Sequence, residues 1–373
     1  MDTPSPDSAD LQKCESSSSP GLTLTNAMPE DASPVEPQDA KVRCVRIPDL
    51  FSSIMATKPV VNPHYHDVKP YADRWITKIM QEDDEWGAKN SKADFCYLSS
   101  LWVPDADEEA LRVVVAWNEW IFHFDDQFDD GHLSSDPLAA QEEIDMTMAL
   151  MGEEPPLQRE ANPIRWLFQN IWNHFKKRAS PDLQQRFKGM HKIYFDGLLT
   201  QIKAMHQGRL LQRSVQEYMD MRRGTIGTYA AVALAEYAHG IKLQQEIVDH
   251  PSLQDCLCIM SDLVVLKDLA LGVDINLMSI LTEQGLSTQQ AMDKIGVQID
   301  DCYKRWYIAL ANMPVWGEEI DREVLKFVEA CRCVALGNLY WSFKTGRYLG
   351  YEGYEVRRTR MLHLPPSGAH GPA

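Results

Sequence analysis

An apolar, aromatic helical stretch runs directly into four carboxylates in the segment WNEWIFHFDDQFDD, residues 117–130. Asp125 and Asp129 are four residues apart, as are Asp126 and Asp130, so each pair shares one face of a helix. Like charges at this spacing repel each other, and the repulsion grows where water is scarce. The preceding run VVVAW indicates a buried helix, so the cluster predicts a bound cation. Carboxylate oxygens suit Mg²⁺.

Two other interpretations of the acidic run are open. A solvated helix end is the usual state of such a run. A calcium loop of the EF-hand type fits poorly, because with Gly131 as its glycine Phe128 would take a ligand position and Pro137 the closing glutamate position. A magnesium site completed by substrate phosphates agrees best with these residues.

Composition limits the class of protein. With 373 residues, 44% of them hydrophobic, the chain is long enough for a large core, and its net charge of −17 argues against a nucleic-acid partner. We expect no membrane span, since no stretch approaches 18 uninterrupted apolar residues. We also expect no secretory signal, since the start MDTPSPDSAD lacks the basic region and apolar run of one. The eight cysteines form no CxxC pair, which indicates reduced thiols and a cytoplasmic location.

The periodicity predicts an all-α chain. Residues 1–42 are rich in Ser, Pro, Asp and Glu and are expected to be a disordered tail, residues 43–350 one domain, and residues 351–373 a C-terminal tail. Helical period dominates the domain, with almost no alternation typical of strands. The expected helices are 68–83, 108–126, 163–179, 182–205, 214–239, 254–271, 288–313 and 322–348.

Two further motifs carry positive charge. In YMDMRRGTIG, residues 218–227, two arginines suited to phosphate stand beside two glycines inside a helical segment. Each glycine costs roughly 1 kcal/mol in a helix interior, which indicates close backbone approach or a local break that exposes carbonyl oxygens. In the segment KTGRY, Arg347 and Tyr348 are placed to donate to diphosphate. A surface arginine pair and a basic helix end are the structural alternatives for these two motifs.

DDQFDD, RRGTIG and the C-terminal Arg-Tyr pair, in that order, resemble the motifs of fungal class I terpene synthases, mostly sesquiterpene cyclases. RIPDLF at 46–51 and NPHY at 62–65 also match the start of those catalytic domains, so the resemblance covers about residues 43–350. It implies a single class I terpenoid synthase-like helical bundle with a central apolar pocket. It also implies three Mg²⁺ ions and an isoprenyl diphosphate substrate, here farnesyl diphosphate.

The resemblance also assigns roles by position. Asp125 becomes the main metal ligand, and Asp126 and Asp129 further ligands or outer-sphere groups. Arg223 becomes the diphosphate sensor, and Ile226 and Gly227 the linker and effector at a helix break. Arg347 and Tyr348 bind diphosphate in the closed state. The candidates for the aromatic wall that would stabilise a cation are Phe95, Trp117, Phe122, Tyr194 and Trp341.

One region departs from the family. Its second metal motif, Asn-Asp-x-x-Ser-x-x-Lys-Glu or an Asp-ended form, is represented here only by IMSDLVVLKDLA at 259–270. Lys267 matches the diphosphate-binding lysine and Asp268 the terminal metal-binding carboxylate, but the Asn and Ser ligands have no counterpart in register. Since the flanks match, the simplest account is a loss of about seven or eight residues, close to two helical turns. Such a loss nearly preserves the helical face, so we expect the fold to survive and one Mg²⁺ site to be impaired.

The sequence therefore predicts a lyase of sesquiterpene biosynthesis, a terpene cyclase, as a monomer or homodimer of open product identity. A non-catalytic, degenerate helical binding protein is the alternative, and a chain-elongating prenyltransferase fits less well because Asp268 lacks neighbouring aspartates. The expected catalytic residues are Arg223, Gly227 and Tyr348. The expected diphosphate ligands are Arg223, Lys267, Arg347 and Tyr348, and the expected metal ligands are Asp125, Asp126, Asp129 and Asp268.

Overall fold

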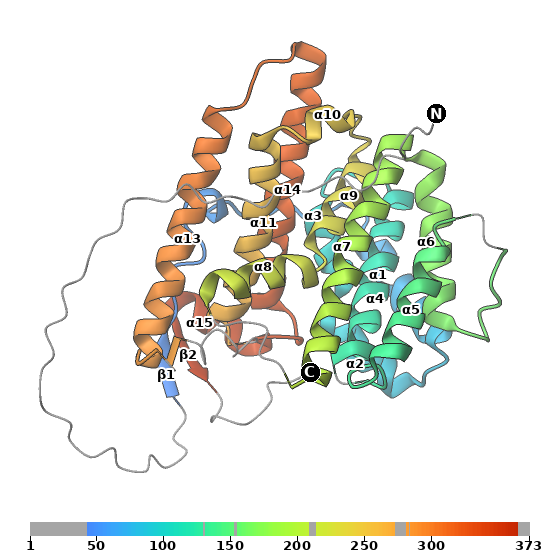
Figure 1. Cartoon of the computed structure of the whole chain (residues 1–373), viewed down its shortest axis with the longest axis horizontal. Coiled ribbons are helices and arrows are strands. Elements are labelled where there is room, and N and C mark those ends of the chain that lie inside the picture. Colours follow the sequence, from blue (N-terminus) through green and yellow to red (C-terminus); the bar gives the residue numbers. More distant parts are fainter. Residues whose placement is uncertain are drawn as a thin grey trace, which may run out of the picture.

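The computed structural model describes residues 43–129, 131–152, 155–208, 214–272, 281–282 and 284–364. The expected N-terminal tail lies outside these residues. The described chain is a bundle of α-helices with one short two-stranded ribbon (Figure 1). The all-α fold predicted by the periodicity is thus confirmed.

Helices make up most of the described chain. In its first half they are α1 (Tyr65–Met80), α2 (Asp84–Ala93), α3 (Phe95–Trp102), α4 (Glu108–Asp129), α5 (Pro137–Ala149), α6 (Pro163–Arg178) and α7 (Pro181–His206). In its second half they are α8 (Val215–Thr225), α9 (Thr228–His239), α10 (Gln245–Val248), α11 (Pro251–Ala270), α13 (Thr288–Ala311), α14 (Glu318–Lys344) and α15 (Gly353–Thr359), with short 3₁₀ turns at Ser53–Met55 and Gly350–Glu352.

Local sequence explains where several helices begin. Helices α5, α6 and α7 each have proline in the first turn, where its missing N–H would have no intrahelical partner. The residue before each proline caps the helix, because the side chains of Asp136, Asn162 and Ser180 accept hydrogen bonds from backbone N–H groups of the first turn. Ser287 and Gln290 form a reciprocal capping box at the start of α13. These starts therefore follow from residues next to them in the sequence.

Helix α11 lies in the interior of the C-terminal half. It packs against α13, α14, α8 and α9, and every residue from Cys256 to Ala270 is buried. A helix that is apolar on all sides is stable only inside a bundle. It runs without a break across the point where the family motif is shortened, as expected for a loss close to two whole turns.

Helix α8 joins the two halves of the molecule. In Figure 1 it crosses between the group around α4, α5, α6 and α7 and the group formed by α11, α13 and α14. It packs on α7 from the first group and on α11 from the second. Residues of α8 therefore contact both groups of helices, so a site formed by the two groups together can include residues of α8.

Some expectations need correction. The helix expected over 214–239 is divided into α8 and α9 by Gly227, whose φ of 70° is left-handed. The C-terminal tail expected from residue 351 contains α15 and the strand β2 (Met361–Leu364), which pairs antiparallel with β1 (Arg43–Arg46). The sequence pattern of these four-residue strands is too short to reveal a pairing that joins segments over 300 residues apart.

The short helices α2 and α3 were not predicted, for opposite reasons. No residue of α2 is buried, whereas all residues of α3 are buried, so neither shows the one-sided apolar stripe that reveals a helix. No helix in the described ranges has the length and apolar character needed to cross a membrane.

Candidate active site

The acidic end of α4 is anchored by Asp125. Its carboxylate is half-buried and accepts a hydrogen bond of 2.7 Å from the Tyr194 hydroxyl on α7. Desolvation and the charge of Asp129 raise the pKa of Asp125 to about 7, against the opposing effects of the Tyr194 hydrogen bond and the charge of Arg222. This carboxylate is therefore costly to ionise by itself, and a nearby cation would favour its charged form.

The other carboxylates of the run are more exposed. Asp126 has a side-chain exposure of 57%, and its carboxylate lies 3.8 Å from a guanidinium nitrogen of Arg347 and 3.9 Å from Nδ1 of His123. Asp129 is exposed, and Asp130 lies outside the described residues. Among its described residues the acidic run thus has one half-buried member, Asp125, and two exposed members at the end of α4.

The break between α8 and α9 lies beside Asp125. At Gly227 the left-handed backbone brings the Cα close to Ile121 of α4 and Tyr194 of α7, so an added Cβ would lie 3.6 Å and 3.9 Å from their side chains. On α7, an added Cβ on Gly197 would lie 2.7 Å from the carbonyl oxygen of Gly224, whereas an added Cβ on Gly224 would meet only the Cα of Gly197, at 4.0 Å. The break predicted for the glycines lies at Gly227, and the backbone at Gly224 does approach a neighbouring helix closely, but the glycine that this approach requires is Gly197.

The two arginines of α8 have different surroundings, and a guanidinium nitrogen of Arg222 donates to Thr225 Oγ1 at 3.3 Å. Arg223 is bound by Asp262 of α11, with Nε–Oδ1 and Nη2–Oδ2 distances of 2.6 and 3.0 Å, and by Asp220 at 2.6 Å. Asp262 is also paired with Arg305 of α13 at 3.0 Å. Arg222, by contrast, lowers the pKa of Asp125 and also that of Lys267 and Tyr348 through its charge. Arg222 is therefore the arginine whose charge reaches the groups on both sides of the site.

The end of α11 forms the opposite wall. The ammonium of Lys267 donates to Asp268 Oδ1 at 2.5 Å and to Ser342 Oγ of α14 at 2.9 Å, and it lies 4.7 Å from the ring centre of Tyr348. Burial lowers the pKa of Lys267, although Asp268 acts in the opposite direction. Burial and then the charge of Asp268 raise the pKa of Tyr348, so its hydroxyl stays protonated and can donate.

Aromatic side chains connect the two walls. Phe95 and Phe122 are stacked with ring centres 4.5 Å apart, and Trp341 lies 5.5 Å from Phe122 and 5.2 Å from Tyr348. The guanidinium of Arg347 lies over Phe122 at 4.6 Å. Three of the five predicted wall residues, Phe95, Phe122 and Trp341, thus form one cluster with the C-terminal Arg-Tyr pair.

The other aromatic candidates have different surroundings. The Trp117 indole N–H donates to Nε2 of the buried His191 at 3.0 Å, within a core that also contains Trp120 and Phe168. Tyr194 holds Asp125 instead of lining an apolar wall. Lys344, predicted to share a helical face with the Arg-Tyr pair, ends α14 and lies over Tyr97 at 3.8 Å.

The structure thus places the predicted site residues in two groups. Asp125 and Gly227 both lie beside Tyr194. Lys267, Asp268 and Tyr348 form the other group, and Arg347 lies between Asp126 and the aromatic cluster. Sequence reasoning missed the partners Tyr194, Ser342 and Asp262. An adjacent arginine pair signals phosphate binding but not which member faces it. Partners that lie 39 to 75 residues away along the chain leave no local signal.

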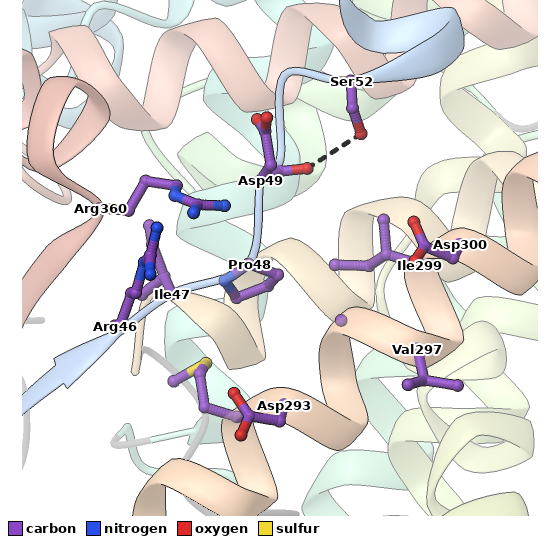
Figure 2. Close-up of a pocket in the computed structure, with 12 residues that line it drawn as sticks. Arg46, Ile47, Pro48, Asp49, Ser52, Asp293, Val297, Ile299, Asp300 and Arg360 are labelled. Carbon is purple, nitrogen blue, oxygen red and sulfur yellow. Dashed lines mark hydrogen bonds between the residues drawn. The ribbon is translucent and has the colours of Figure 1, made fainter.

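A different pocket, of about 400 Å³, lies between the segment after β1 and α13 (Figure 2). Arg46 and Arg360 lie on one side of it, and Asp293 and Asp300 of α13 lie on the other. None of the predicted site residues line it. Its charged walls are unsuited to an apolar hydrocarbon, so it is not the pocket that the resemblance implies.

The two walls differ in how well they suit a divalent cation. Asp125, Asp126 and Asp129 supply hard oxygen donors, and the raised pKa of Asp125 shows negative charge that lacks full compensation. Asp268 already holds the Lys267 ammonium. In the described ranges no three His, Cys, Asp or Glu side chains are grouped tightly enough to enclose a metal by themselves. The α4 end fits Mg²⁺ only as an ion completed by water and ligand oxygens, the usual state of bound Mg²⁺.

Comparisons with known proteins agree with this geometry. A family model described as "Terpene synthase family 2, C-terminal metal binding" matches residues 116–305. The chain is 49% identical over 331 residues to (+)-eremophilene synthase of Gibberella fujikuroi, which covers 86% of this chain and 92% of that protein. It is 42% identical to a protein of the same fungus named inactive (1R,4R,5S)-(-)-guaia-6,10(14)-diene synthase, and the alignment covers 87% of this chain and 86% of that protein.

Solved structures share the fold. Germacradien-4-ol synthase from Streptomyces citricolor superposes with a TM-score of 0.65 at 16% identity, covering 76% of this chain and 95% of that one. At this identity the likeness bears on the helical architecture alone, and it agrees with the bundle described above.

Proposed function

The chain belongs to terpene synthase family 2, and we propose that it is a terpene cyclase that ionises an isoprenyl diphosphate and cyclises the resulting allylic cation to a sesquiterpene. Farnesyl diphosphate is the proposed substrate. One observation carries the proposal: a chain of contacts connects the two walls. Arg347 lies 3.8 Å from Asp126 and 4.6 Å from the ring centre of Phe122. Trp341 lies 5.5 Å from Phe122 and 5.2 Å from Tyr348, whose ring faces the Lys267 ammonium at 4.7 Å. A dianionic or trianionic leaving group between these walls would meet cations and donors on both sides.

Membership of this family implies dependence on a divalent metal, and we propose Mg²⁺, with three ions expected from the resemblance. Asp125 would be the main ligand, with Asp126 and Asp129 beside it at the exposed end of α4. The metal would neutralise the charge that develops on diphosphate as the carbon–oxygen bond breaks. Tyr194 orients the Asp125 carboxylate by its 2.7 Å hydrogen bond.

Protein groups complete the diphosphate site in this proposal. Arg347 and the protonated hydroxyl of Tyr348 donate from the C-terminal side, and Lys267 supplies positive charge from α11. We assign the arginine that faces diphosphate to Arg222. Arg223, which the sequence assigned to this role, is proposed to hold α8 against α11 through Asp262, since both carboxylates around it are protein groups. Gly227 ends α8 beside Asp125 and gives the backbone freedom to present carbonyl oxygens at the break.

The aromatic cluster supports the second half of the reaction. Phe95, Phe122 and Trp341 present π faces next to Arg347 and Tyr348, where diphosphate would leave. An electron-poor hydrocarbon is stabilised by aromatic faces in a site that excludes water. We propose that the domain comprises residues 43–364, since β2 closes onto β1. We further propose that the protein acts in the cytoplasm as a monomer or homodimer.

The direct test is to incubate the purified chain with farnesyl diphosphate and Mg²⁺ and to analyse hydrocarbons by gas chromatography. Because the α11 motif is shortened, we expect slow turnover to a cyclic sesquiterpene, abolished by EDTA and by Asp125→Asn. The control variant Asp196→Asn removes a carboxylate that is 61% exposed on α7 and should leave turnover unchanged. Absence of turnover together with unchanged binding in Asp125→Asn would rule out the proposed function.

A non-catalytic binding protein is the second candidate, and the Lys267–Asp268 pair favours it, because the pair occupies a wall where the family has metal ligands. Thermal stabilisation by inorganic diphosphate that requires Mg²⁺, without any product from farnesyl diphosphate, would support this candidate. Product formation would exclude it.

A further inference from the structure

The end of α11 carries an ammonium group that is unusually enclosed. The side chain of Lys267 is 4% exposed and that of Asp268 is 10% exposed. Lysine has three N–H donors, and two of them are taken by Asp268 and Ser342. The face of the Tyr348 ring covers the ammonium at 4.7 Å. Such an arrangement holds a buried cation by its own counter-ion, a hydroxyl and an aromatic face.

Helix geometry explains why a lysine stands at this position of α11. In the family motif seven residues, Asn-Asp-x-x-Ser-x-x, stand directly before the lysine. Without them the helix is about 10 Å shorter, at 1.5 Å for each residue, and its face is turned by only about 20°. Lys267 and Asp268 then stand at the positions along and around the helix that the Asn and Asp of the motif would otherwise occupy. The first metal ligand on this wall is thus replaced by an ammonium group.

A divalent ion does not fit beside that ammonium. Asp268 offers a carboxylate already bound at 2.5 Å, and Ser342 Oγ accepts a hydrogen bond from the same lysine. Mg²⁺ requires six oxygen ligands in octahedral geometry and usually keeps several waters. The positive charge of Arg222, which acts on Lys267, further disfavours a second cation.

We propose that Lys267 is a resident cation that replaces the divalent metal of the α11 wall, with Asp268 as its counter-ion, so that all metal ions of this protein bind at the α4 end. The inference rests on the proposed function, because it concerns the same diphosphate site. It changes the role of Asp268 from metal ligand to partner of Lys267. It also predicts the slow turnover expected above, because an ion pair without net charge stands where a divalent cation would pull on the leaving group.

Mn²⁺ binding tests the proposal without any turnover. Free Mn²⁺ is measured by electron paramagnetic resonance during titration of the full chain in the presence of inorganic diphosphate, for the wild type, Asp125→Asn and Asp268→Asn. We expect Asp268→Asn to bind the same number of Mn²⁺ ions as the wild type, with an affinity within about twofold, whereas Asp125→Asn loses at least tenfold. A lower Mn²⁺ count in Asp268→Asn would overturn the proposal.

A double-mutant cycle in EDTA tests the ion pair when no metal is present. Asp268→Asn should lower the Tm by removing the counter-ion of a buried ammonium, and Lys267→Met together with Asp268→Asn should recover most of that loss. If Asp268→Asn leaves the Tm unchanged or raises it in EDTA, the carboxylate is not held by Lys267 and the proposal fails. A wild type that binds no Mn²⁺ with diphosphate but shows the coupled Tm loss would instead contradict the proposed function alone.

Discussion

The ends of α4 and α11 each carry a carboxylate at the end of a long helix, but the two carboxylates have different partners. Asp125 is held by a neutral hydroxyl, that of Tyr194, and its pKa rises to about 7. Asp268 is held by the ammonium of the preceding residue, Lys267. The difference suits our proposal that metal binds at the α4 end, because only there is the carboxylate without a protein cation as its direct partner.

The strongest test of this contrast is Asp125→Asn. The variant keeps the size of the side chain and removes the charge, so we expect diphosphate-dependent Mn²⁺ affinity and turnover to fall by about 100-fold or more. Binding is followed by paramagnetic resonance and turnover by gas chromatography. The exposed Asp196→Asn is the matched control, and an equal loss in that variant would show that the effect is not local.

A second carboxylate of α11, Asp262, is expected to matter for stability instead. It is buried and compensates Arg223 and Arg305, so Asp262→Asn should destabilise the fold by about 3 kcal/mol. Urea denaturation measures the loss. Asp301→Asn, which breaks an exposed pair with Lys304, should cost less than about 1 kcal/mol. Similar losses in the two variants would contradict the assignment of Asp262 to a buried ion-pair network.

The α4 side should also be the acid-sensitive side of the bundle. Burial lowers the pKa of His191 to about 4 from its ordinary 6.5, so the neutral ring belongs to the folded state. Its contribution is complete above pH 6.5 and is lost as the pH falls toward 4, which removes about 2 kcal/mol between pH 7 and pH 5. Urea denaturation at the two pH values measures this. His191→Gln should flatten the pH dependence, and an unchanged slope would show that other groups cause it.

Restoring the missing part of α11 should make the two walls alike. Insertion of Asn-Asp-x-x-Ser-x-x before Lys267 returns the metal ligands and moves the lysine two turns along the helix. We expect turnover to rise by roughly tenfold, about 1.4 kcal/mol, with additional bound Mn²⁺. An inserted segment of seven residues without Asn, Asp or Ser is the control. A folded insertion variant without extra Mn²⁺ would show that the gap does not limit the metal site.

The smallest effect is expected at Tyr348. Tyr348→Phe keeps the ring over Lys267 and beside Trp341 but removes the hydroxyl proposed to donate to diphosphate. The affinity for farnesyl diphosphate should fall by about fivefold, close to 1 kcal/mol for one hydrogen bond. Tyr97→Phe, on the ring that faces Lys344, is the matched control. A much larger loss would place Tyr348 in a role beyond hydrogen bonding.

Periodicity and end signals in the sequence were sufficient for the long helices. The expected helices 163–179 and 182–205 differ from α6 and α7 by at most one residue at either end. Proline and a capping residue mark the starts of both helices. The predicted glycine break appeared at Gly227, since a left-handed residue interrupts a helix wherever it stands. The β1–β2 pairing and the buried helix α3 were not predictable in this way, because neither has a periodic face.

The sequence by itself determined the helical fold, the three motifs and the shortened α11, because periodicity, helix caps and residue spacing act over a few turns of chain. Only the tertiary structure decided that Arg223 binds Asp262, and that Lys267 is enclosed by Asp268, Ser342 and Tyr348. The reason is physical: whether a charge serves a ligand or another side chain depends on partners distant in the sequence, whose approach is set by helix packing and desolvation.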